Sequence, residues 1–226
     1  MPDSDSIDSD KIVRVWDWPV RLTHWSFAVL VFAMWQTAEN GAWYWHTRLG
    51  VVLFGLLIFR VIWGVIGSRT ARFSQFVKGP GAVLGYLRGN WRNRIGHSPL
   101  AALSVIALLG AMSVQVGMGL FSGDPYDGAT GPLNGFVGVA TADMLTGWHE
   151  QFYWAVLGLA GFHILAIAFY ASAKQNDLVT PMITGKREVD STVEGNTRAS
   201  PVRALVALGV AGSIAYWVWL GAPPFG

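Results

Sequence analysis

Two histidines with a helical spacing are the residues best suited to chemistry in this sequence. His149 and His163 are 14 residues apart in the stretch WHEQFYWAVLGLAGFHILAIAFY. At about 100° per residue they would lie within about 40° of one another on one helical face, and at about 1.5 Å per residue they would be about 21 Å apart along the axis. One helix would thus give an imidazole ligand to each of two stacked metal centres. The alternative is that both imidazoles form hydrogen bonds between helices.

The absence of cysteine limits the metal chemistry that is open to the chain. With no Cys among its 226 residues, it cannot form disulfides, thiolate zinc sites or iron–sulfur clusters. It also lacks the C-x-x-C-H motif that attaches c-type haem covalently.

Long apolar runs are the elements that would position the histidines. The composition is 52% hydrophobic and the mean hydropathy is +0.38, which is too apolar for an ordinary soluble domain. Residues 152–173 contain no Asp, Glu, Lys or Arg and are long enough to cross a bilayer core of about 30 Å as a helix. Five spans are predicted in total, at 22–38, 49–67, 99–121, 152–173 and 204–222.

Basic residues alternate between the connections as the positive-inside rule predicts. Of the 16 Lys and Arg residues, all but Arg48 and Arg60 lie before the first span, between the second and third, or after the fourth. The connection at 123–147 has none and carries Asp124, Asp127 and Asp143. We therefore expect a multi-pass protein of a bacterial inner membrane, with a cytoplasmic N-terminus and a periplasmic C-terminus. The pI of about 9.0 then reflects topology and not nucleic-acid binding.

This topology fixes the depth of four histidines. His24 begins the first span on the cytoplasmic side, and His46 begins the second on the periplasmic side. The fourth span runs inward, so His149 lies at its periplasmic end and His163 in its cytoplasmic half. The four residues divide into two depth-matched pairs, His24 with His163 and His46 with His149.

Two facing imidazoles in apolar surroundings suit haem better than zinc. Zinc normally takes three or four protein ligands, whereas haem iron needs two axial ligands. With both axial positions filled, the iron has no open position for oxygen or substrate, so outer-sphere electron transfer is the expected chemistry. Two such haems about 20 Å apart would carry electrons across the membrane.

Three further polar residues lie in or beside the predicted spans and are interpreted separately. Arg60 is 14 residues after His46 on the same helical face, where it would pair with a haem propionate or extend to the cytoplasmic interface. Arg48 is the corresponding cofactor-binding candidate on the outer side. His97 precedes Pro99 at the entry to the third span, and we interpret it as an interfacial or capping residue.

The remaining segments are interpreted from composition. Residues 1–10 are predicted to be a disordered acidic tail, residues 11–187 the haem-binding domain, and residues 188–203 a polar linker to the last span. The tryptophan-rich segment at 13–25 is expected to lie in the membrane interface, and a short amphipathic helix is predicted around 82–87. Small residues that would let helices or a flat cofactor approach closely are Gly117, Gly119, Gly158 and Gly161.

Several of these motifs resemble the bacterial di-haem cytochrome b561 family, which includes the cytochrome b subunits of nickel hydrogenases. The motifs are R-L-T-H-W at 21–25, W-H-T-R-L-G at 45–50, F-R-V-I-W-G at 59–64, G-W-H-E at 147–150, G-F-H at 161–163 and P-M-I-T-G-K at 181–186. The resemblance implies an all-α membrane fold, a four-helix bundle that holds two non-covalent b haems, here with a fifth C-terminal span. It also assigns His24 and His163 to the cytoplasmic-side iron, and His46 and His149 to the periplasmic-side iron.

The function that the resemblance implies is electron transfer between the quinone pool and a periplasmic redox partner, either a c-type cytochrome or a hydrogenase-like subunit. The acids Asp124 and Asp127 would attract a positively charged cytochrome. One alternative is a stand-alone superoxide:quinone oxidoreductase, as in some relatives. A second alternative is a haem-free membrane scaffold that uses the histidines only for hydrogen bonds.

Overall fold

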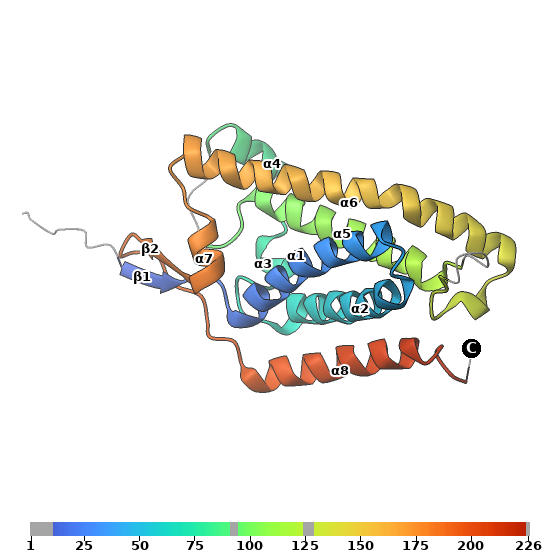
Figure 1. Cartoon of the computed structure of the whole chain (residues 1–226). Helices are drawn as coiled ribbons and strands as arrows, with labels where there is room; N and C mark the ends of the chain where they lie inside the picture. The colour runs from blue at the N-terminus through green and yellow to red at the C-terminus, as the bar shows by residue number, and fades with distance from the viewer. Residues whose placement is uncertain (1–10, 91–94, 124–128, 225–226) are drawn as a thin grey trace, which may run out of the picture.

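Helices make up most of the computed structural model, which describes residues 11–90, 95–123 and 129–224. The long helices are α1 (Trp18–Glu39), α2 (Trp43–Ile66), α5 (Pro99–Phe121), α6 (Val139–Ala173) and α8 (Pro201–Trp219) (Figure 1). Among the described residues, four helices are long and apolar enough to cross a membrane: α2, α5, α6 and α8. The fifth long helix, α1, has 22 residues and is not one of these four, so the first predicted span is a helix whose crossing is not established.

The helices extend beyond the apolar runs that predicted them. α2 begins at Trp43 rather than at residue 49, and α6 begins at Val139 rather than at residue 152. Asp143 and Glu150 lie before the uncharged run but within the helix. With 35 residues, α6 is about 52 Å long, which exceeds the bilayer core of about 30 Å. His149 therefore lies well inside α6 and not at its first turn.

Three of the long helices start with the same local chemistry. In each, a side-chain oxygen before the first turn accepts a backbone N–H that has no partner within the helix, and a proline occupies one of the first two positions. The capping residues are Asp17 for α1, Ser98 for α5 and Ser200 for α8. Asp17 also accepts a hydrogen bond of 3.0 Å from the indole of Trp63 on α2, which links the start of α1 to the end of α2.

α2 is the central helix of the bundle. It packs against α1, α5 and α8, while α6 lies along α5 on the opposite side of the molecule from α8 (Figure 1). α8 contacts α2 through a row of buried alanines, and the Cβ of Ala215 would be only 3.1 Å from a Cβ added at Gly55. Small residues on both helices thus allow the close approach that is typical of membrane helices. The alanines are Ala204, Ala207, Ala211 and Ala215.

Two strands that are separated by most of the chain pair like the arms of a hairpin and close one end of the bundle. β1 (Lys11–Arg14) pairs antiparallel with β2 (Lys186–Val189), with Arg14 opposite Lys186. We call this the hairpin end, and we call the other end, where α1 finishes at Glu39 and α5 at Phe121, the loop end. Short helices at the hairpin end are α3 (Phe73–Phe76), α4 (Pro80–Leu87) and α7 (Val179–Thr184), and a 3-10 turn, η1 (Asn134–Phe136), follows α5. α4 confirms the short helix predicted around residues 82–87.

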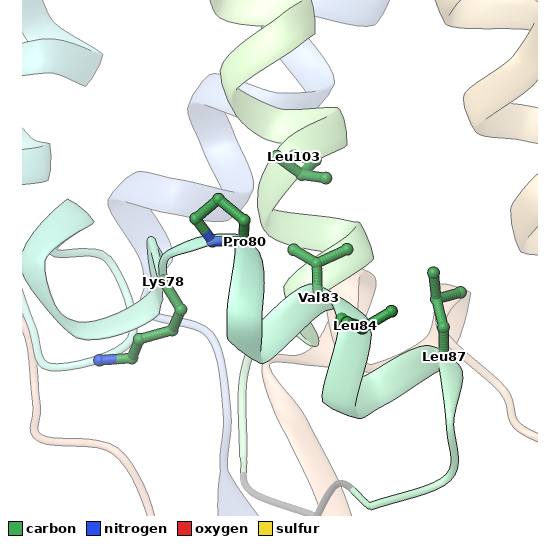
Figure 2. Close-up of a pocket in the computed structure, with 6 residues that line it drawn as sticks. All are labelled: Lys78, Pro80, Val83, Leu84, Leu87 and Leu103. Carbon is green, nitrogen blue, oxygen red and sulfur yellow. The ribbon is translucent and has the colours of Figure 1, made fainter.

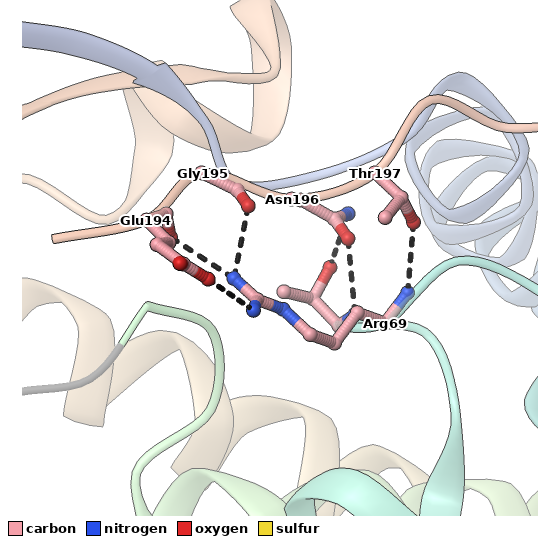
Figure 3. Close-up of polar contacts among 6 residues, drawn as sticks. Arg69, Glu194, Gly195, Asn196 and Thr197 are labelled. Carbon is pink, nitrogen blue, oxygen red and sulfur yellow. Dashed lines mark hydrogen bonds and ion pairs between the residues drawn. The ribbon is translucent and has the colours of Figure 1, made fainter.

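The segment predicted as a linker, residues 188–203, is held against the bundle. The Asn196 side chain accepts from the backbone N–H of Thr70 at 3.2 Å and donates to the Val15 carbonyl at 3.1 Å. Arg69 makes an ion pair of 3.2 Å with Glu194 and donates to the carbonyl of Gly195 at 2.9 Å (Figure 3). These contacts join the segment that leads into α8 to the residue after β1 and to the loop after α2. The segment between β2 and α8 is therefore part of the fold.

Two of the sequence predictions fall outside the described residues. The acidic tail at 1–10 is one of them, and the pair Asp124 and Asp127 is the other. Asp143, the third acid of that connection, is exposed near the start of α6.

Candidate functional site

The four histidines singled out by depth meet as two pairs. His24 of α1 faces His163 of α6 near the hairpin end, with ring centres 6.3 Å apart and planes inclined at 55°. His46 of α2 faces His149 of α6 near the loop end, with ring centres 6.1 Å apart and perpendicular planes. We call these the hairpin-end pair and the loop-end pair. α6 supplies one member of each, as the spacing of its two histidines predicts.

The spacing within each pair fits a metal ion held by two imidazole nitrogens. A nitrogen lies roughly 1.1 Å from the centre of a five-membered ring whose bonds are about 1.33 Å, and a metal–imidazole bond is about 2 Å. Two rings on opposite sides of one metal should therefore have centres about 6.2 Å apart. The measured distances are 6.3 Å and 6.1 Å. Direct stacking of two imidazoles would bring the centres closer than this.

Hydrogen bonds at Nδ1 leave Nε2 as the basic nitrogen in the loop-end pair. His149 Nδ1 donates to the carbonyl of Gln115 at 2.9 Å, and His46 Nδ1 donates to the carbonyl of Met34 at 3.1 Å. A carbonyl only accepts, so the proton of each neutral ring is on Nδ1 and the lone pair is on Nε2. This is the arrangement that supports histidine metal ligands in proteins.

In the hairpin-end pair, only one of the two Nδ1 atoms has a hydrogen-bond partner among the described residues. His163 Nδ1 is 3.2 Å from the hydroxyl of Ser104, whereas the buried Nδ1 of His24 has no hydrogen-bond partner among the described residues. Ser104 and Gln115 are 11 residues apart on α5, which is about 20° of helical rotation. One face of α5 therefore supports both histidines of α6, and this shared face is the sequence signal that could have revealed the two residues.

Gly119 makes room for the imidazole of His149. A Cβ at this position would be 2.8 Å from Cε1 and 3.2 Å from Nδ1 of that ring. The other three glycines predicted to allow close approach, Gly117, Gly158 and Gly161, would have no atom within 4 Å of an added Cβ. Of the four, only Gly119 makes room for a side chain of a neighbouring helix. Close approach of a flat cofactor to the other three stays a prediction.

The surroundings suit a metal that needs no further protein ligand. Among the described residues there is no cluster of three or more His, Cys, Asp or Glu side chains placed to hold an ion. The helices that carry the rings instead share an apolar core, to which α5 and α8 also contribute and which contains Leu30, Val51, Val116 and Val156. Two imidazoles in an apolar bundle match the axial ligation of a b-type haem, whose remaining four ligands belong to the macrocycle.

The structure separates the two arginines predicted to bind a cofactor. Arg60 is only 5% exposed and donates to the carbonyl of Ala71, in the loop after α2, at 3.4 Å. Its pairing with a haem propionate and its extension to the interface both stay predictions. Arg48 lies over the ring of Tyr44 at 3.2 Å and 4.9 Å from Trp219 of α8. Since it follows His46 by two residues, it projects about 200° away from that histidine around α2. The structure does not bring Arg48 to the loop-end pair.

The capping role considered for His97 is wrong, and its interfacial placement stays a prediction. Ser98, not His97, caps α5. The His97 ring packs against Trp16 and Phe76, with ring centres 4.6 Å and 4.4 Å away. Burial, followed by the charge of Arg60, lowers the pKa of His97 to about 3. It is therefore a neutral member of an aromatic layer at the hairpin end.

An apolar hollow of about 360 Å³ lies beside α4 at the hairpin end (Figure 2). Its lining residues come from α4, the segment before it and one turn of α5: Lys78, Pro80, Val83, Leu84, Leu87 and Leu103. α4 is joined to α6 by a hydrogen bond of 2.5 Å between the hydroxyls of Tyr86 and Tyr170. Tyr170 is two turns beyond His163, so the hollow and the hairpin-end pair share one end of the bundle.

Membrane-length helices around two apolar histidine pairs are the features of a membrane cytochrome of the b type. A family model described as prokaryotic cytochrome b561 matches residues 15–185. This range covers most of the chain, and the chain belongs to that family. It is a multi-pass membrane cytochrome that binds b-type haem and takes part in electron transfer. No curated protein and no solved structure matches the chain.

Proposed function

We propose that the protein holds two b haems and transfers electrons across a bacterial inner membrane, between the quinone pool and a periplasmic redox partner. In this proposal His24 and His163 are the axial ligands of one haem, and His46 and His149 those of the other. The observation that carries it is that both pairs have the separation expected of two imidazoles on one iron. Their α6 members are about 21 Å apart along the helix axis.

The chain's own residues then have defined roles. When bound, b haem supplies a one-electron couple. Each imidazole pair would hold one haem through its ring nitrogens. The carbonyls of Gln115 and Met34 fix the tautomers of His149 and His46, and the apolar side chains exclude water. This set of roles favours electron transfer over a reaction at the iron.

The charge pattern supports an orientation with the hairpin end in the cytoplasm. Arg14, Lys186 and Arg187 lie in the hairpin, and Arg69 and Arg72 in the loop after α2. α1 lies beside α2, and its 22 residues correspond to about 33 Å, enough to cross the bilayer core. With α1 as a fifth crossing, the N-terminus is cytoplasmic, α8 ends in the periplasm, and the loop-end pair is the outer one.

The two electron-exchange partners would then approach opposite ends. The apolar hollow beside α4 suits the isoprenoid tail and ring of a quinone, and α4 is hydrogen bonded to α6 two turns from His163. At the loop end, Trp45 and Trp148 are 59% and 54% exposed and directly precede His46 and His149. A c-type cytochrome or a hydrogenase-like subunit that docked there would be close to the outer pair.

Haem counting in single histidine variants tests the proposal. The purified wild-type protein should contain two haems per chain and show two potentials in a redox titration. His163→Ala and His24→Ala should each lose the same haem, and His149→Ala and His46→Ala should each lose the other. One haem per wild-type chain would contradict the proposal. Loss of different haems from the two members of a pair would contradict it as well.

A further inference from the structure

The hairpin end contains a basic pocket that neither histidine pair uses. It has a volume of about 160 Å³ and is lined by Arg14, Trp16, Trp18, Arg21, Thr184, Gly185 and Lys186. Three of these residues are cations and none is acidic. Among the described residues, none of the three cations forms an ion pair. The pocket therefore concentrates positive charge without an internal counter-charge.

The strand register forces two of the cations together. Arg14 of β1 lies directly opposite Lys186 of β2. Like charges at directly opposed positions destabilise an antiparallel pair, and the cost is removed when an anion lies between them. A negatively charged ligand between the two strands would therefore stabilise this pair of cations.

Arg21, the third cation, lies at the same place, directly beside the backbone of Gly185. Arg21 follows the start of α1, and its buried Nε has no hydrogen-bond partner among the described residues. Gly185 has a φ of +81°, a conformation that favours glycine. A Cβ at Gly185 would overlap the Arg21 guanidinium and come within 2.8 Å of the Trp16 carbonyl. The chain therefore keeps this position free of a side chain where the guanidinium lies.

An apolar stripe leads away from the pocket along α1. Trp18, Leu22, Trp25 and Val29 recur at the spacing of one helical face and are 46%, 60%, 42% and 65% exposed. A pocket for an anion that continues into a lipid-facing apolar stripe is complementary to a molecule with a charged head and hydrocarbon chains. A free phosphate ion would use the pocket but not the stripe.

We propose that this pocket is a specific binding site for an acidic phospholipid. The phosphate lies between Arg14, Arg21 and Lys186, and the acyl chains follow the exposed face of α1. Anionic lipids of the cytoplasmic leaflet are attracted to basic side chains with a contribution of about fivefold in affinity for each cation. The inference does not depend on how many haems the protein holds.

Lipid titration of the purified haem-loaded protein tests this site. Short-chain phosphatidylglycerol and phosphatidylcholine of the same chain length are added in a neutral detergent, and the shift in melting temperature is followed by tryptophan fluorescence. The wild type should bind phosphatidylglycerol more tightly than phosphatidylcholine. The double variant R14Q/K186Q should bind phosphatidylglycerol about 25-fold more weakly and lose this preference.

Two control variants separate the pocket from the overall charge. K174Q/R203Q removes the same number of charges from exposed positions at the same end and should keep the preference. R14K/K186R keeps both charges in the pocket and should also keep the preference, which would assign the loss in R14Q/K186Q to the removal of charge.

Three results would overturn the proposal. The first is a wild-type protein that does not distinguish the two lipids. The second is a full melting shift with inorganic phosphate alone, which would make the site one for a free ion. The third is loss of haem from R14Q/K186Q, which would make a haem propionate the anion in the pocket.

Discussion

Gly119→Ala should displace the imidazole of His149 and weaken haem binding at the loop-end pair. The new methyl group would be 2.8 Å from Cε1 of the ring, whereas carbon atoms in contact are about 3.5–4.0 Å apart. The ring must therefore move by roughly 0.7–1.2 Å. It cannot do so without cost, because its Nδ1 is fixed at 2.9 Å from the carbonyl of Gln115.

The expected magnitude follows from the tolerance of metal ligation. Ligand distances in metal sites vary by only about 0.2 Å, so a movement of this size cannot be absorbed in the bond to iron. Introducing a methyl group into a packed interior costs about 1–3 kcal/mol. If this cost appears only when haem is bound, affinity at the loop-end pair falls by roughly 5- to 150-fold. The haem at the hairpin-end pair should remain.

The assay is a count of haem per chain together with a redox titration, because the two sites should differ in potential. Gly117→Ala is the matched control. It adds the same methyl group on the same helix, but that methyl group would meet no atom within 4 Å. Both variants gain the same helix propensity. The reasoning is refuted if Gly119→Ala keeps both haems at unchanged potentials, or if Gly117→Ala loses haem to the same extent.

Three other substitutions give separate expectations. Ser104→Ala removes the hydroxyl that lies 3.2 Å from Nδ1 of His163 and should weaken haem binding at the hairpin-end pair by about 10- to 100-fold. The control is Ser113→Ala, because the hydroxyl of Ser113 is hydrogen bonded only within its own helix. This control should leave the haem content, measured by absorption, unchanged. Asn196→Ala should lower the free energy of unfolding by about 1–3 kcal/mol, because it leaves buried polar groups unpaired. Glu194→Gln should change the free energy of unfolding by less than about 1 kcal/mol. Both values are measured by denaturant titration in detergent. Leu84→Trp fills the hollow beside α4 and should slow haem reduction by a quinol in stopped-flow absorption without changing the haem content; an unchanged rate would place the quinone elsewhere.

The positions of the histidines could be predicted because they depend on two simple periodicities. Helical rotation places His149 and His163 on one face, and the alternation of basic charge sets the direction of each helix. The structure then brings His24 to within 6.3 Å of His163 and His46 to within 6.1 Å of His149, between ring centres. That these residues bind haem iron is still a prediction.

The hairpin and the role of Arg48 could not be predicted in the same way. Each strand has four residues, too few for an alternating pattern to stand out, and the strands are separated by most of the chain. Arg48 was assigned by its depth alone, but its direction around α2 places it over Tyr44 and beside Trp219. Hydropathy marks only the part of a helix that lies in lipid. The predicted spans therefore did not include the first residues of α2 and α6.

The hairpin has a consequence for how the protein is made. β1 precedes all the long helices in the chain, but its partner β2 follows α6 and α7. His24 and His46 must likewise wait until the membrane-insertion machinery has released α6, which carries both of their counterparts. A nascent chain that stops after α5 has one histidine of each pair and an unpaired strand. Under the proposed ligation, haem is captured between paired histidines only after α6 has been inserted, and cofactor loading is then a late step in biogenesis.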